Sequence, residues 1–163
     1  MDYGNRNSKA YAMKNNYGMS ILSMDVNRVW NSFIDVSENG LVHIDGRYIS
    51  RRNHVVLRNT KYLMGKTRIE LREEDLNKNI YGTDVLFDEY DKPYFHCLTN
   101  YDNNGNPVYR DVYPEEVFGT ILGEMKIAAS IQAEVEMTSC CLTIPFNTSD
   151  STHKTNNEWL LIN

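Results

Sequence analysis

Apolar side chains recur at helical spacing in one stretch of this 163-residue chain. The stretch begins at Pro114, with Glu115 and Glu116 directly after it. A proline at the first helical position has no N–H to leave unpaired, and carboxylates favour the positive end of the helix dipole. The positions that then recur at helical spacing are Val117, Ile121, Leu122, Met125, Ala128, Ala129 and Gln132. The pattern predicts an amphipathic helix that begins at Pro114.

A short apolar run over residues 140–144, closed by Pro145, predicts a buried strand after this helix. Asp150 and Ser151 then have the character of a helix cap, which predicts a final helix through Trp159. A helix, a buried strand and a second helix form an α/β unit that needs more sheet beside it.

The first third of the chain predicts a tail followed by strands. Residues 1–17 are rich in polar residues and tyrosine without periodicity, so we expect a disordered N-terminal tail. Residues 21–26, 29–36 and 41–44 then predict three strands of an antiparallel meander. Asn39-Gly40 supplies a tight turn between the last two.

The middle of the chain predicts short strands, one helix and a hairpin. Residues 54–57 and 62–64 are expected to be strands, and 67–79 a helix that Thr67 caps with Glu70 three residues on. Residues 94–99 and 108–112 flank turn-forming residues, which predicts a hairpin. We expect one domain over 18–163, with a smaller subdomain inserted at 46–112.

Composition narrows the class of protein. The hydrophobic fraction of 41% is that of an ordinary globular domain, and the net charge of −5 argues against sequence-independent nucleic-acid binding. No apolar run approaches the length of a membrane span, and the N-terminus lacks the apolar core of a secretion signal. The three cysteines form no disulfide framework, so reduced thiols in a cytoplasmic protein are expected. The histidines show no metal-ligand spacing with cysteines or acids, so no metal site is expected.

Several segments together resemble the nucleotide-binding domain of the seventy-kilodalton heat-shock chaperone family. Residues 113–117 match the family's Y-P-E-E-V, Met125-Lys126 its K-M-K, and 143–145 its T-V-P. The match runs without a gap from Met125 to Asp150 and extends more loosely over roughly 20–161. The resemblance implies a truncated first lobe of an actin-like ATPase domain. Its fold class would be α/β, a ribonuclease-H-like mixed sheet with helices and a small inserted α+β subdomain.

The resemblance also implies where ATP or ADP with Mg²⁺ would bind. The family's phosphate loop corresponds to residues 24–31 of this chain. The matching nucleotide-binding positions are Asp25, Asn27, Arg28, Val29 and Trp30. Asp25 keeps the family's residue near the metal. The loop is otherwise degenerate, because Asn27 replaces the glycine that lets backbone N–H groups approach phosphate and Arg28 and Val29 replace hydroxyls.

Two further family positions fall on named residues. Lys78, in the frame 78–82, matches the catalytic lysine of K-R-L-I-G; Lys61, in the frame 61–65, is the competing candidate and is assigned to an earlier strand. The residues that relay nucleotide state correspond to Pro145 and His153, where histidine replaces the family's arginine.

These expectations lead to one predicted function and two alternative interpretations. The chain is expected to be a heat-shock-chaperone-like binding or interaction module that does not hydrolyse ATP alone. The alternative is an ATP-binding lobe completed by a partner or second copy, with residual ATPase activity. A third reading is a relic of a longer protein without independent function. Because the chain lacks the second lobe, a protein partner or self-association is expected at the exposed lobe face and the C-terminal helix, where residues 159–162 are apolar.

A cluster of arginines in the middle of the chain has two interpretations. Arg47, Arg51, Arg52 and Arg58 could meet a small anion or an acidic lipid head group, or form a solvated basic surface, which is the favoured interpretation.

Overall fold

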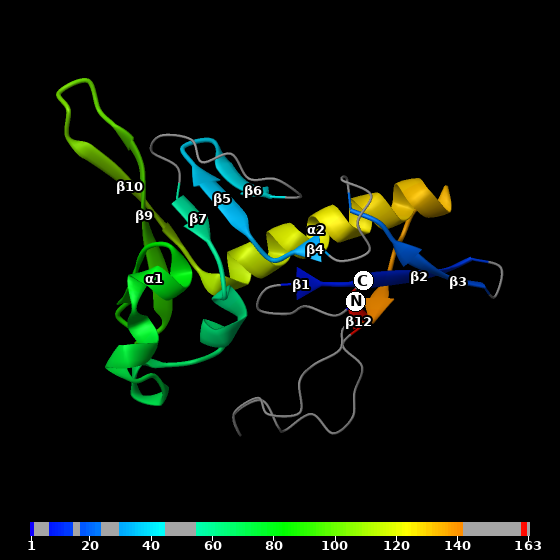
Figure 1. Ribbon diagram of the computed structural model, residues 1–163, viewed down its shortest axis with the longest axis horizontal. Helices are drawn as coiled ribbons and strands as arrows, with labels where there is room; N and C mark the ends of the chain where they lie inside the picture. Colours follow the sequence, from blue (N-terminus) through cyan, green and yellow to red (C-terminus); the bar gives the residue numbers. More distant parts are fainter. Residues whose placement is uncertain (2–6, 15–16, 24–29, 45–54, 142–160, 163) are drawn as a thin grey trace.

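The computed structural model describes residues 1, 7–14, 17–23, 30–44, 55–141 and 161–162. Within them the chain is a mixed α and β structure, made of small antiparallel sheets and one long helix (Figure 1). The strands are β1 (Asn7–Ser8), β2 (Ala10–Lys14), β3 (Tyr17–Ile21), β4 (Trp30–Asn31), β5 (Ile34–Ser37), β6 (Gly40–His43), β7 (Val55–Leu57), β8 (Asp84–Phe87), β9 (Pro93–Tyr101), β10 (Pro107–Val112), β11 (Cys140–Cys141) and β12 (Leu161–Ile162). The helices are α1 (Lys78–Tyr81) and α2 (Pro114–Ala133), with the 3₁₀ turns η1 (Thr60–Leu63), η2 (Arg68–Glu70) and η3 (Glu73–Leu76).

The long helix α2 is the element around which the others pack. It begins at Pro114 as predicted, and the Glu116 carboxylate accepts a hydrogen bond from the Tyr113 N–H at 3.0 Å. The face that it buries carries the expected residues Val117, Ile121, Met125, Ala128 and Ala129, and Ala133 in addition. This face contacts β2, β3, β6, β9 and η1, so α2 joins both ends of the molecule (Figure 1).

The sheet β6–β5–β7 contains the Asn-Gly hairpin that the sequence predicts. Ser37 pairs with Gly40, and the inward residues Ile34 and Val36 of β5 are fully buried. The expected strand over 29–36 is interrupted, because β4 and β5 are separate strands. Within the described residues, β5 pairs with β7 on its other edge, where a meander would have residues 21–26. Of the described residues of that segment, 21–23, Ile21 alone lies in a strand, and 24–26 lie outside the described residues.

The hairpin of β9 and β10 is confirmed, and it lies in a sheet whose third strand, β8, we did not predict. Phe95 and Cys97 of β9 are fully buried. The turn 102–106 is held by the Asp102 carboxylate, which accepts hydrogen bonds from the backbone N–H groups of Asn104 and Asn106 at 2.8 Å each. Since β7 lies inside the predicted insertion 46–112 and pairs with β5 outside it, one sheet spans the expected boundary.

The expectation of a disordered tail over 1–17 does not hold for its described residues. β2 and β3 form an antiparallel hairpin that pairs Ala10 with Ile21, and β1 pairs with β4. Ala10 and Ala12 are buried, at 1% and 7% exposure, whereas Tyr11 and Met13 are exposed. This period of two was missed because the inward residues are small, and packing against α2 makes the hairpin stable.

Two predictions for residues 60–81 are wrong. The expected strand 62–64 lies mostly in the 3₁₀ turn η1, and the expected helix 67–79 is divided into η2, η3 and the start of α1. The local prediction at Thr67 is correct, because its N–H donates to the Glu70 carboxylate at 2.8 Å. Ile69, an apolar residue within the expected helix, is 92% exposed, so it does not help to hold a longer helix against the core.

The C-terminal strand is less buried than expected in its described part. Cys140 and Cys141 form β11 and pair with Ile162 and Leu161 of β12. Cys140 is half-buried and Cys141 is exposed. Residues 142–160, which include the rest of the expected strand and the expected helix through Trp159, lie outside the described residues.

Candidate functional site

Of the five residues that the resemblance assigns to nucleotide binding, the structure describes Trp30. Its indole is 1% exposed, its Nε1–H donates to the Ile21 carbonyl at 3.2 Å, and its ring stacks on His43 with a centroid distance of 5.4 Å. Trp30 is therefore part of the core at β4. Asp25, Asn27, Arg28 and Val29 lie outside the described residues, as do Pro145 and His153 of the expected relay and Arg47, Arg51 and Arg52 of the basic patch.

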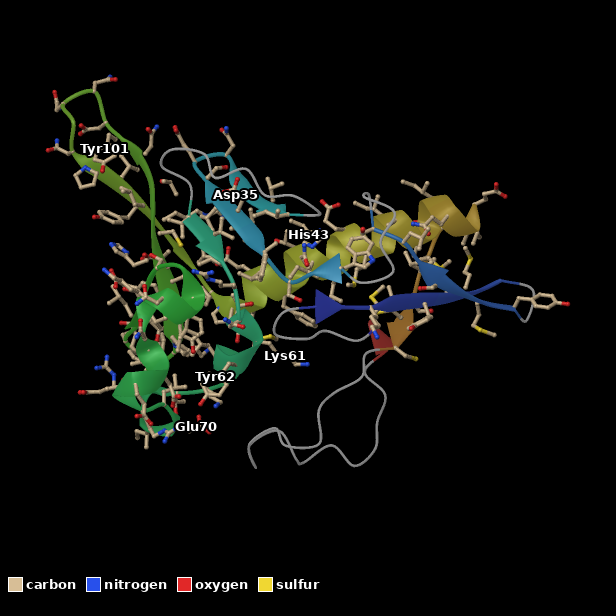
Figure 2. The ribbon with its side chains drawn as sticks, viewed as in Figure 1. Asp35, His43, Lys61, Tyr62, Glu70 and Tyr101 are labelled. Carbon is tan, nitrogen blue, oxygen red and sulfur yellow. The ribbon has the colours of Figure 1, made fainter. Side chains whose placement is uncertain are left out.

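The two lysines that compete for the family's catalytic position lie on different elements. Lys61 is half-buried on η1, which packs against α2, and Figure 2 shows it beside Tyr62 and apart from His43. Lys78 is exposed at the start of α1, which packs against β8. The two lysines therefore lie on different elements, η1 and α1.

A pocket of about 490 Å³ lies at the corner between the end of β7 and α1. We call it the corner pocket. Its lining residues are Phe33, Arg58, Asn59, Asn79 and Ile80. They come from the residue before β5, the segment after β7 and the helix α1, so segments distant in sequence meet here.

Backbone contacts fix the walls of the corner pocket. The Arg58 N–H donates to the Tyr81 carbonyl at 3.2 Å, and the Asn59 side-chain amide donates to the Ile80 carbonyl at 2.8 Å. Gly82 ends α1 with φ +96°, and a Cβ there would lie 2.1 Å from the Val56 carbonyl oxygen. Only glycine fits this close approach of two backbones, so α1 is held directly against β7.

The exposed side of α2 carries a second surface of interest. Gly119, Gly123, Ile127 and Ile131 follow one another every four residues, and we call them the α2 row. Ile127 is 56% and Ile131 64% exposed, while no atom lies within 4 Å of a Cβ built on either glycine. Residues four apart lie on one side of a helix, so the row presents two apolar projections and two hollows.

A shallow apolar hollow of about 150 Å³ adjoins the α2 row. Leu122, Gly123 and Met137 are among its lining residues. It extends the apolar surface from the helix toward β11.

Two buried groups have shifted acidities without lying in either candidate site. Burial raises the pKa of the Cys97 thiol to about 12, and burial, followed by nearby Tyr62, raises the pKa of the Tyr81 phenol. Both side chains belong to the core, where desolvation disfavours the charged form.

The remaining acidic and histidine clusters lie in ordinary structural contacts. Arg72 pairs with Glu74 at 2.7 Å and with Asp75 at 3.3 Å, which accounts for the acidic run 73–75. His96 Nδ1 contacts the Asp111 carboxylate at 2.7 Å across β9 and β10. Among the residues that the structure describes, no group of three or more His, Cys, Asp or Glu side chains could hold a metal ion. None of the helices in those ranges has the length and apolar content needed to span a membrane.

Comparison with known proteins adds no family to this description. The scan against protein-family models finds no match for the chain, and the search of curated proteins finds no significant match. The resemblance to the chaperone ATPase lobe stays a prediction from the sequence.

The sequence did not lead us to predict either candidate surface, the α2 row or the corner pocket. The recurrence of residues 119, 123, 127 and 131 every fourth position was the available signal for the α2 row, whereas no spacing marks the corner pocket.

Proposed function

We propose that this chain is an interaction module, similar to a truncated first lobe of the chaperone ATPase domain, that associates with a second copy of itself and does not hydrolyse ATP alone. The actin-like half-domain fold belongs to the same proposal. The observation that carries the self-association is the α2 row, because its projections and hollows are complementary to each other.

The complementarity follows from the spacing. In an antiparallel pair with its two-fold axis midway between residues 123 and 127, Ile127 of each copy meets Gly123 of the other. The same axis brings Ile131 opposite Gly119. A two-fold interface must present the same surface twice, and a row of two hollows and two projections at equal spacing satisfies that requirement. Rows of residues four apart are also the ridges that interdigitate in the commonest helix packing.

The size of the row sets the strength of the expected dimer. From Gly119 to Ile131 the row spans about 18 Å at about 1.5 Å per residue. One helix face of this length buries less than the roughly 800 Å² per partner of a standard interface. We therefore expect a weak, concentration-dependent dimer with a dissociation constant of roughly micromolar or above.

Sedimentation velocity over a concentration series tests the self-association. The wild type should shift toward a dimer as concentration rises, and the double variant Ile127→Glu, Ile131→Glu should stay monomeric because each copy would place two carboxylates in the apolar contact. Ile69→Glu is the matched control, since Ile69 is exposed on η2 away from the row. A monomeric wild type at high concentration, or equal loss of the dimer in the control, contradicts the proposal.

The absence of independent ATP hydrolysis rests on the loop chemistry. Asn27, Arg28 and Val29 offer neither the glycine nor the hydroxyls that a phosphate loop of this kind needs. Steady-state assays should give the same background rate for the wild type, Lys61→Ala and Lys78→Ala. A rate above background that either variant abolishes would instead establish the ATPase alternative and identify its lysine.

A further inference from the structure

The side chains around the corner pocket combine one cation, two amides and two apolar groups. Arg58 and Asn79 are exposed, Phe33 and Asn59 are half-buried, and Ile80 is 37% exposed. A volume of about 490 Å³ falls within the range of small-molecule sites. The pocket is therefore large enough for a ring with one polar substituent.

The polar groups of the pocket divide into those already used by the fold and those still available. The Arg58 N–H, the Asn59 amide N–H and the Asn79 N–H each have a partner within the protein. By contrast, the Arg58 guanidinium and the Asn79 carboxamide have no hydrogen bond or ion pair to any residue in the described part of the chain. The fold is satisfied without them, so both can bind a ligand.

The available groups favour one ligand chemistry. A guanidinium presents a planar fork of N–H donors that binds two oxygens of a carboxylate or phosphate at once. The Asn79 amide adds a donor, and Lys78 is an exposed cation at the neighbouring position. Phe33 and Ile80 supply apolar surface for the body of the ligand.

We propose that the corner pocket binds a small organic anion, with its carboxylate or phosphate group on Arg58 and Asn79 and an apolar ring against Phe33 and Ile80. The proposal needs neither self-association nor nucleotide binding. It can therefore be tested independently of the function proposed above. For a ligand of about ten heavy atoms we expect a dissociation constant of roughly 1 mM.

Amide and side-chain chemical shifts from the ¹⁵N-labelled protein test the proposal. Phenyl phosphate and benzoate are the two anionic probes, and they separate the phosphate from the carboxylate form of the ligand. Benzyl alcohol supplies the ring without the charge, and inorganic phosphate supplies the charge without the ring. We expect saturable shifts at Arg58, Asn59 and Asn79 for at least one aromatic anion and binding at least tenfold weaker for benzyl alcohol and inorganic phosphate.

Matched variants link the binding to the pocket. Arg58→Met keeps the length of the side chain and removes its charge, and it should weaken the aromatic anion at least tenfold. Lys92→Met removes one exposed positive charge from the β8–β9 turn and should leave the affinity unchanged. Asn79→Ala changes an exposed amide and should weaken binding about threefold to tenfold, so it provides a second test if Arg58→Met perturbs the fold.

Four results would overturn the proposal. The first three are shifts spread over the surface without saturation, equal affinity of wild type and Arg58→Met, and equal weakening by Lys92→Met. Equal affinity for inorganic phosphate and phenyl phosphate would also contradict it, because the apolar wall would then contribute nothing.

Discussion

Single residues fix the geometry of the corner between β7 and α1, and Gly82 is the most constrained of them. Its backbone is left-handed, and its Cα faces the Val56 carbonyl so closely that a methyl group would overlap the oxygen. Gly65 is also left-handed, at φ +67°, but a Cβ there would meet no atom within 4 Å. The two glycines therefore separate the effect of backbone conformation from that of close approach.

Replacing each glycine by alanine should have unequal effects on the free energy of unfolding. Gly65→Ala should lower it by about 1 kcal/mol, since the left-handed conformation alone is disfavoured by that amount. Gly82→Ala should lower it by about 3 kcal/mol or more, because α1 must also move away from β7. Urea denaturation of both variants measures the difference, and equal losses would show that the close approach can relax.

The buried thiol of Cys97 predicts a loss of stability in alkali. Burial raises its pKa to about 12, whereas an unfolded thiol ionises near pH 8.5. The folded state thus keeps the Cys97 proton to higher pH than the unfolded state does. The contribution of this thiol to the free energy of unfolding is therefore complete below about pH 8.5 and is lost as the pH rises toward 12. Tyr81, whose pKa is also raised, adds to the slope above about pH 10.

Cys97→Ala should flatten this pH dependence between pH 9 and 10, whatever its effect on stability at neutral pH. Denaturation curves at several pH values measure the slope. Cys141→Ala removes an exposed thiol and should leave the slope at its wild-type value. If the slope of Cys97→Ala equals that of the wild type, this thiol does not control alkaline stability.

At the scale of elements, one side chain joins α2 to the end of β3. The Gln132 Oε1 accepts from the Leu22 N–H at 2.9 Å, and its Nε2 donates to the Leu22 carbonyl at 2.6 Å. These two hydrogen bonds resemble those that a neighbouring strand would make. They provide partners for both the N–H and the carbonyl of Leu22. The N-terminal hairpin is thereby held to the helix.

Gln132→Ala should lower the free energy of unfolding by about 2 kcal/mol, because it leaves two half-buried backbone groups without partners. Gln132→Glu should still accept from the Leu22 N–H but cannot donate to the carbonyl when ionised. It should therefore be destabilised at pH 7 and partly restored near pH 4, as measured by thermal unfolding at both values. No recovery in acid would mean that the donor half of the contact is unimportant.

The elements that the sequence predicts well are those with strong local signals. α2 has Pro114 at its start and a long apolar period, and the β5–β6 hairpin has Asn39-Gly40. The wrong predictions concern segments whose structure depends on distant partners. The N-terminal hairpin buries only alanines in its first strand, and residues 60–81 form short turns because the apolar residues there do not share one face.

The candidate sites differ in the same way. The α2 row lies within one helix, so its period is visible in the sequence. The corner pocket joins Phe33, Arg58 and Asn79, which are brought together by the pairing of β5 with β7 and by the contact of α1 with that sheet. The spacing of residues along the sequence does not indicate that segments so far apart come into contact. Trp30, which the resemblance places in the nucleotide-binding loop, has its side chain buried in the core.

At the scale of the whole molecule, α2 connects two ends that each carry a projecting hairpin, β2–β3 and β9–β10 (Figure 1). The helix contributes to the core cluster of buried residues and contacts strands from both ends. The exposed side of the same helix is then the side left for a second copy. Association there would couple the stability of the fold to protein concentration.

The melting temperature should accordingly rise with protein concentration for the wild type. The same series with Ile127→Glu, Ile131→Glu should show no such rise, because the monomer would be the only folded species.

Gly119→Leu gives an independent comparison. It should stabilise the isolated helix by about 1 kcal/mol through helix propensity while filling one hollow of the row. A Gly119→Leu protein that still dimerises would exclude the two-fold arrangement.

The contact between Gly82 and Val56 has a consequence for the kinetics of any ligand in the corner pocket. Because two backbones touch there, the backbone of the pocket walls is held in place before a ligand binds. Association should then follow a single exponential whose rate rises linearly with ligand concentration, without the plateau that a slow conformational step imposes. The close backbone approach that requires glycine at position 82 would thus favour fast association of the ligand.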